Sequence, residues 1–213
     1  MSIASLFIAF AFALPAGAEQ YWVTWEGNDF PENEGWERDL WGPEPIRILE
    51  EGMMTLDTRE TIALWDAYKM YRSLDPGPGE VFLLQWRIRV DEVTGGTDPG
   101  LWLKTDNYRS IDFYLGIDHV DLPGFVTIAE FEPWVFHEFE FSSSDMESFQ
   151  FRVDGVLTYE GTMLPSGYAS MVGWGDVVYG ASNLATWDYV RFGVVPEPSS
   201  AWLLGLALVA RRI

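Results

Sequence analysis

The feature that most constrains this chain is a repeated alternation of apolar and polar side chains in short runs. Residues 80–90 read EVFLLQWRIRV, and every second residue from Phe82 to Val90 is apolar. Successive side chains of a β-strand point to opposite faces of a sheet, so this run predicts a strand with one buried face. Similar runs follow at residues 110–116, 135–141, 149–153 and 187–193.

Turn residues separate these predicted strands. Asp154-Gly155 joins residues 149–153 to residues 156–160, which predicts a β-hairpin. Residues 75–80 (DPGPGE) and 94–100 (TGGTDPG) have the composition of loops. Residues 62–72 fit either a helix or a strand, and the pattern leaves this choice open. Many short strands joined by such turns predict an all-β, two-sheet antiparallel sandwich.

Composition limits the classes of function. The 213 residues include 33 Asp plus Glu and 13 Lys plus Arg, giving a net charge of −20. This balance argues against nucleic acid and against anionic membrane surfaces, because both need basic patches. The chain has no cysteine, which excludes thiol catalysis and thiolate metal sites. The length suits one domain with its own hydrophobic core.

The first residues have the layout of an export signal. Residues 3–14 are apolar, Pro15 follows, and Ala16-Gly17-Ala18 forms a small-residue cleavage site. The apolar run is short for a transmembrane helix. We therefore expect residues 1–18 to be a secretory signal peptide that is cleaved after Ala18, with Ala16 and Ala18 as the cleavage-site residues.

The last residues, 195–213, combine a proline-rich tripeptide, an apolar run at residues 201–210 and two terminal arginines. A helix over this run would reach about 15 Å, half of a hydrocarbon core of about 30 Å. The segment resembles the PEP-CTERM sorting signal of exported bacterial proteins. That resemblance implies exosortase-type machinery, transient membrane association through a short hydrophobic helix, and a cell-surface or extracellular-matrix location. Its motif residues here are Pro196, Glu197, Pro198, Arg211 and Arg212.

The remaining residues, 19–194, resemble the concanavalin A-like lectin/glucanase family. Three segments carry the resemblance: WEGNDFPENEGW (25–36), FRVDGVLTYEG (151–161) and WDYVRFG (187–193). The resemblance implies a jelly-roll sandwich. It also implies a structural Ca²⁺ ion, with Asp29 and Asp188 as ligands by their positions in the opening and closing segments.

Catalytic patterns are weak in this sequence. Glycosidases of the resembled fold carry alternating carboxylates on one strand, but Glu138 and Glu140 lack the central Asp and the third carboxylate. We expect these two glutamates to mark the solvent face of their strand. His119 and His137 have no metal-pair spacing, and no G-x-S-x-G nucleophile elbow is present. No catalytic residue is predicted.

The aromatic content points instead to binding. Most of the 11 Trp, 9 Tyr and 14 Phe residues are expected in the core, but four lie beside polar or glycine-rich stretches where they could stack on sugars. We therefore expect an exported, surface-sorted, non-catalytic protein that binds an extracellular glycan. A structural surface or matrix protein and a glycoside hydrolase are the alternatives. The four predicted glycan-binding residues are Trp102, Tyr108, Trp174 and Tyr179.

Overall fold

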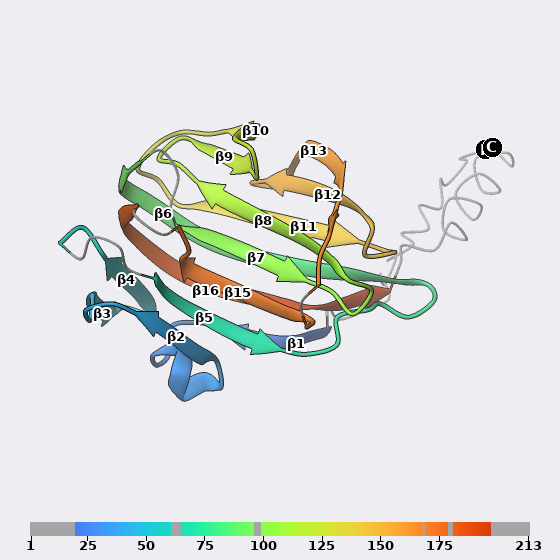
Figure 1. The fold of residues 1–213 in the computed structure, drawn as a ribbon, viewed down its shortest axis with the longest axis horizontal. Helices are drawn as coiled ribbons and strands as arrows, with labels where there is room; N and C mark the ends of the chain where they lie inside the picture. Colours follow the sequence, from blue (N-terminus) through green and yellow to red (C-terminus); the bar gives the residue numbers. More distant parts are fainter. Residues whose placement is uncertain (1–19, 61–64, 96–98, 168, 179–180, 197–213) are drawn as a thin grey trace, which may run out of the picture.

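The computed structural model describes residues 20–60, 65–95, 99–167, 169–178 and 181–196. They form two eight-stranded sheets, A and B, in which all described strand pairs are antiparallel. The strands run roughly along the long axis of the molecule (Figure 1). The predicted two-sheet jelly-roll sandwich is confirmed.

Sheet A follows the order β13 (Val156–Thr162), β12 (Ser148–Val153), β11 (His137–Ser143), β6 (Glu80–Thr94), β16 (Ser182–Pro196), β4 (Met53–Asp57), β3 (Ile46–Glu50), with β1 (Gln20–Trp25) also on β16. Sheet B follows the order β10 (Val126–Glu130), β9 (His119–Leu122), β8 (Arg109–Leu115), β7 (Gly100–Lys104), β15 (Met171–Asp176), β5 (Trp65–Tyr71), β2 (Glu37–Trp41), with β14 (Leu164–Pro165) also on β8. The short 3-10 helix η1 (Pro31–Glu34) precedes β2.

The core lies between the two sheets and is rich in aromatic side chains. Trp86 of β6 stacks on Phe139 of β11 with ring centroids 5.5 Å apart, and Phe113 reaches it from sheet B at 5.7 Å. Burying each such side chain stabilises the fold by roughly 1.5–3 kcal/mol. The alternation in residues 80–90 thus produces a strand whose apolar face closes the sandwich, as predicted.

Two further predictions have structural outcomes. The hairpin at Asp154-Gly155 is confirmed, with φ angles of 50° and 77° at its two central residues. Both angles suit a tight hairpin turn. The ambiguous segment 62–72 is a strand from Trp65 to Tyr71, paired with β2 and β15. Its residues 62–64 lie outside the described part of the chain.

The two ends of the sequence fall mostly outside the described residues. The expected signal peptide, with Ala16 and Ala18, lies outside them, as do Glu197, Pro198, Arg211, Arg212 and the expected hydrophobic helix. Val195 and Pro196, the first residues of the expected sorting segment, are the last two residues of β16 and pair with β6. In the part of the chain that is described, no helix combines the length and apolarity needed to cross a bilayer.

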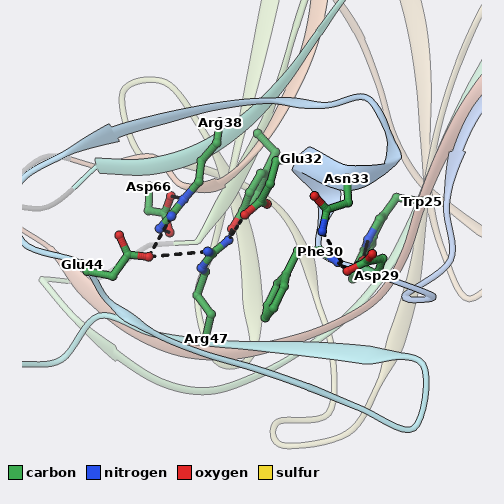
Figure 2. A network of polar contacts seen from close by, with 10 residues as sticks. Trp25, Asp29, Phe30, Glu32, Asn33, Arg38, Glu44, Arg47 and Asp66 are labelled. Atoms are coloured by element: carbon green, nitrogen blue, oxygen red, sulfur yellow. Dashed lines mark hydrogen bonds and ion pairs between the residues drawn. The ribbon is translucent and has the colours of Figure 1, made fainter.

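A polar network ties the edges of the two sheets together near η1 (Figure 2). Arg38 of β2 donates to both carboxylate oxygens of the fully buried Asp66 of β5, at 2.7 and 2.9 Å. Arg47 of β3 donates to Glu32 at 2.7 Å and to the Tyr68 hydroxyl at 3.0 Å. Because Arg47 belongs to sheet A and Tyr68 to sheet B, these bonds connect the layers at this end of the sandwich.

Candidate functional site

A cleft on the outer face of sheet B gathers aromatic and charged side chains. Its cavity of about 190 Å³ is bordered by residues of β5, β7, β8 and β15 and by Val177. A neighbouring hollow of about 480 Å³ shares Trp65, Tyr114 and Val177 and extends to the turn between β9 and β10. The two hollows therefore form one surface, called here the sheet B cleft. The lining residues of its smaller part are Trp65, Lys69, Trp102, Lys104, Asp112, Tyr114, Met171 and Val177.

Two tryptophans form the apolar wall of the sheet B cleft. The rings of Trp65 and Trp102 lie 5.5 Å apart with 49° between their planes. Trp102 is the register partner of Gly173 on β15, and a Cβ built on Gly173 would come within 2.2 Å of the indole. Glycine in a strand often marks the close approach of another group. Gly173 thus allows the Trp102 ring to lie directly against the strand.

Asp112 is the carboxylate inside the cleft. It lies on β8 with its neighbours Ile111 and Phe113 buried in the core, so its own side chain points to the outer face. Burial raises the pKa of Asp112, and the Lys104 ammonium opposes this rise in part. The Tyr114 hydroxyl donates to Asp112 at 3.5 Å. Burial and the Asp112 charge together raise the pKa of Tyr114 to about 12.

The two lysines of the cleft have different surroundings. Lys69 forms an ion pair with Asp39 of β2 and lies 5.9 Å from the Trp65 ring centroid. Burial lowers the pKa of Lys104; the Asp112 charge opposes this and the Lys69 charge adds to it. The cleft therefore places an acid with a raised pKa beside an ammonium group and two aromatic rings.

A second carboxylate lies next to Asp112 on the same face of sheet B. Asp121 of β9 is the register partner of Tyr114, which places it diagonally across from Asp112. Such diagonal neighbours have Cα atoms about 7–8 Å apart. Asp121 is buried, accepts a hydrogen bond from Thr127 Oγ1 at 2.7 Å, and lies 3.6 Å from His119 Nε2.

A larger hollow, about 580 Å³, lies at the serine-rich turn between β11 and β12. Its carboxylate, Glu160, accepts a hydrogen bond from Gln150 at 2.7 Å. The aromatic side chain that borders it, Phe149, is buried in the core and stacks on Phe141. The sheet B cleft therefore offers the more reactive combination of groups, although its cavity is smaller.

The structure separates the predicted glycan-binding residues. Trp102 borders the sheet B cleft but is only 5% exposed, so it supports Trp65 from behind. Tyr108 lies at the turn between β7 and β8 and is exposed. Trp174 is fully buried, with its ring 4.8 Å from those of Tyr68 and Trp187, so it is a core residue that a glycan does not reach. Tyr179 lies outside the described residues.

The two predicted calcium ligands are engaged by other groups. Asp188 of β16 forms an ion pair with Arg87. Asp29 accepts hydrogen bonds from the Phe30 N–H at 2.7 Å and from Asn33 at 3.0 Å, and these bonds lower the pKa of Asp29. Among the described residues, no group of three or more His, Cys, Asp or Glu is placed to hold a metal. The guanidinium at Asp188 does not fit a calcium site, and calcium binding stays a prediction.

Glu138 and Glu140 point away from the core on the outer face of sheet A, as the alternation predicted. Glu138 accepts a hydrogen bond from the Tyr189 hydroxyl. Glu140 accepts one from Gln85 at 2.9 Å and one from Arg152 at 3.2 Å. Both carboxylates therefore act as partners in the polar surface of sheet A.

Sequence reasoning missed most of the sheet B cleft. The alternation in residues 110–116 places Asp112 and Tyr114 on one polar face of the predicted strand, and this is a usable signal. Lys69 and Trp65 belong to the segment whose structure was ambiguous. Nothing local in the sequence brings these residues to Lys104, because the pairing of β5 and β7 with β15 does so.

No protein-family model matches this sequence, and no curated protein matches it significantly. Solved structures do match. The carbohydrate esterase vb_24B_21 from Shiga toxin-encoding bacteriophage phi24B superposes with a TM-score of 0.61 at 10% identity, over 84% of this chain and 99% of its own. An endo-1,3-beta-glucanase from Streptomyces sioyaensis has a TM-score of 0.55 at 14% identity, over 76% and 90%. A glycosyl hydrolase family protein from Mycobacterium fortuitum has a TM-score of 0.56 at 15% identity, over 82% and 100%.

At these identities the likeness shows the fold, which is that of the resembled glucanase-type sandwich. The expectation of a non-catalytic protein is wrong on this comparison, because these matching structures are an esterase and glycoside hydrolases. The alternative of a glycoside hydrolase is the better supported one.

Proposed function

We propose that this chain is a carbohydrate-active enzyme of the glycoside hydrolase type that takes its substrate in the sheet B cleft. Asp112 acts as the proton donor and Asp121 as the second carboxylate. The observation that carries the proposal is the position of Asp112, a carboxylate with a raised pKa in a cleft walled by Trp65 and Trp102.

The aromatic wall supplies binding. Sugar rings present apolar C–H faces that pack on indole rings, while their hydroxyls need polar partners. Trp65, which is partly exposed and packs on the buried Trp102, offers such a surface, and Lys104, Asp112 and Tyr114 offer polar atoms beside it. A sugar ring held on Trp65 would therefore lie next to Asp112.

The carboxylates supply the chemistry. A hydrolase needs one protonated acid to donate a proton to the leaving oxygen and one carboxylate to activate water or attack the sugar. A raised pKa keeps the Asp112 carboxyl protonated to a higher pH than an exposed carboxyl, which suits the donor role. Inversion needs carboxyl groups about 6.5–9.5 Å apart, and Asp112 and Asp121 are diagonal neighbours on one face of sheet B.

The neighbours add support from outside the chain. The three described above are named as a carbohydrate esterase, an endo-1,3-beta-glucanase and a glycosyl hydrolase family protein. All three names refer to enzymes that act on carbohydrates, although an esterase and a glycosyl hydrolase break different bonds.

The test is product release by the purified full chain from a panel of neutral and acidic polysaccharides. We expect new reducing ends with the wild type, and a loss of at least about 100-fold in Asp112→Asn and Asp121→Asn, because removal of an acid or base costs about 10²–10⁴-fold. Glu138→Gln is the matched control, since its carboxylate lies on sheet A bonded to Tyr189.

Two results would overturn the proposal. One is full turnover by Asp112→Asn, with melting curves showing that the variant is folded. The other is release of acetate from an acetylated glycan without any cleavage of the chain.

A further inference from the structure

The larger part of the sheet B cleft differs in character from the part that holds Asp112. Its volume is about 480 Å³, and its described lining includes no charged side chain. The polar side-chain groups of that lining are the Tyr114 hydroxyl and the Trp65 indole N–H, and the indole nitrogen is buried. The other described lining residues are apolar or glycine and belong to the turn between β9 and β10 and to residues 177–178.

Phe125 presents an aromatic surface at the edge of this hollow. Its side chain is 79% exposed. A tight turn holds it there, because the Phe125 N–H donates to the Leu122 carbonyl at 3.0 Å and Gly124 supplies a φ of 89° between them. Pro123, whose ring fixes its own φ, completes the turn. Phe125 and the hollow thus form one exposed apolar surface, and such surfaces mark binding sites.

An apolar group fits this hollow better than a bare sugar ring does. The hydroxyls of a sugar that faced the apolar wall would lose water without gaining hydrogen-bond partners, which costs free energy. An apolar group in the same place releases water from both surfaces, and the gain grows with the apolar area that is buried. The hollow therefore suits an apolar substituent on the sugar that lies beside Asp112.

Tyr114 connects the two parts of the cleft and indicates which substituent fits. It borders both hollows, and its hydrogen bond to Asp112 is long, at 3.5 Å. Burial and the Asp112 charge raise the pKa of Tyr114 to about 12, so its hydroxyl keeps its proton at neutral pH. The hydroxyl is thus available to donate to a carbonyl oxygen placed where the hollows meet. An acyl ester offers that carbonyl together with an apolar chain, whereas an alkyl ether offers the chain alone.

We propose that the substrate is an O-acylated glycan, whose acyl chain lies against Phe125 in the larger part of the sheet B cleft while its ester carbonyl accepts a hydrogen bond from Tyr114. This inference rests on the proposed function and narrows its substrate class. The sugar chain remains the part that is cleaved, and the ester serves recognition.

The experiment is isothermal titration of the full chain with trisaccharides of glucose, xylose and mannose, each unsubstituted, O-acetylated, O-butyrylated and O-ethylated. In at least one sugar series we expect the butyryl form to bind at least about 10-fold more tightly than the unsubstituted form, with the acetyl form between them. The reason is that each methylene group that becomes buried adds about 4-fold in affinity. The ethyl ether matches the acetyl group in size but lacks its carbonyl, so it should bind more weakly than the acetyl form.

Variants locate the effect. Phe125→Ala should bring the affinity for the acylated forms down to that for the unsubstituted form, whereas Phe125→Leu should retain most of the preference. Tyr114→Phe should abolish the advantage of the acetyl form over the ethyl ether. Leu164→Ala is the matched control, because Leu164 is also an exposed apolar residue of sheet B but borders neither hollow. Melting curves verify that each variant is folded.

The outcomes separate this inference from the proposed function. Cleavage of unsubstituted glycans, with equal affinities for the acylated and unsubstituted forms, would overturn the acyl site and leave the hydrolase standing. An acyl preference that Phe125→Ala removes, without cleavage of any sugar chain, would support the acyl site and overturn the hydrolase. An acyl preference that survives in Phe125→Ala would overturn the placement proposed here. Absence of both binding and cleavage would overturn both.

Discussion

The indole of Trp102 lies against Gly173 of the neighbouring strand so closely that a Cβ there would be 2.2 Å from the ring. Gly173→Ala should therefore displace Trp102 from its place in the cleft and weaken glycan binding by about 10-fold, the equivalent of about 1.4 kcal/mol. Titration with the best-bound polymer measures this loss. Gly167→Ala is the control, because a Cβ at Gly167 meets no atom within 4 Å. Equal affinities for the two variants would contradict the role given to Trp102.

The ionised carboxylate of Asp112 is expected to destabilise the fold at neutral pH, although the proposed function depends on this residue. Burial raises its pKa above 3.8, so the folded state binds its proton more tightly than the unfolded state does. The stability that this tighter proton binding contributes is fully present below the pKa of Asp112 in the unfolded chain. It is lost as the pH rises through the pKa of Asp112 in the folded protein. Asp112→Asn should consequently melt at a higher temperature than wild type at pH 7, with the difference shrinking toward pH 3. Thermal melts across this range test the sign, and a lower melting temperature of the variant at pH 7 would refute it.

The Arg38–Asp66 ion pair at the end of the sandwich should matter for stability. Asp66 is fully buried, and Arg38 contacts both of its oxygens. Arg38→Met leaves that carboxylate without its partner and should lower the free energy of unfolding by about 3 kcal/mol, as measured by urea denaturation. Adding Asp66→Leu should recover much of the loss, since no buried charge remains. Arg59→Met, at an exposed pair with Asp57 and Glu92, should change little.

The proposed sorting signal can be tested without disturbing the last strand. Pro196 belongs to β16 and pairs with Glu80, whereas Glu197 lies outside the described residues. Glu197→Ala alone should therefore leave the melting temperature unchanged and leave an unprocessed tail in the native host. Mass spectrometry of the mature C-terminus shows whether the tail has been processed. A variant processed like the wild type would show that the tripeptide is not recognised.

Calcium binding, which the opening and closing segments predicted, has a direct measurement. An ion that binds only the folded state at a hundredfold excess over its Kd would add about 2.7 kcal/mol of stability. Melting curves in calcium and in chelator would then differ, and Arg87→Gln should enlarge the difference by freeing the Asp188 carboxylate. If the curves in calcium and in chelator superimpose for both the wild type and Arg87→Gln, the protein has no such calcium site.

The fold could be predicted because its signal is local. Alternation along one strand decides which face is buried, and Asp154-Gly155 decides one turn, without knowledge of any other segment. Trp174 shows where this reasoning stops. It lies between Gly173 and Gly175 in a glycine-rich stretch that resembles an exposed loop. In the structure those glycines face outward, and Trp174 points into the core.

The site could not be predicted because it depends on register between distant strands. A Glu-x-Asp-x-Glu pattern lies along a single strand, so it reveals only carboxylates that share that strand. Asp112 and Asp121 lie on β8 and β9 and become neighbours through the pairing of Tyr114 with Asp121. Likewise, Lys69 and Lys104 are 35 residues apart in the sequence and meet across β15.

The long ladder between β6 and β16 bears on when the chain can fold. It pairs Thr94 with Ser182 and Glu80 with Pro196, and β16 also supplies the partner for β1 and part of β4. Contacts between such distant residues slow folding, because a large loop must close before they form. During synthesis, sheet A therefore lacks its central strand until nearly the whole described chain has been made. A chain shortened before Ser182 would keep the pairing of β6 with β11 but leave the other edge of β6 unpaired, and aggregation would compete with folding at that stage.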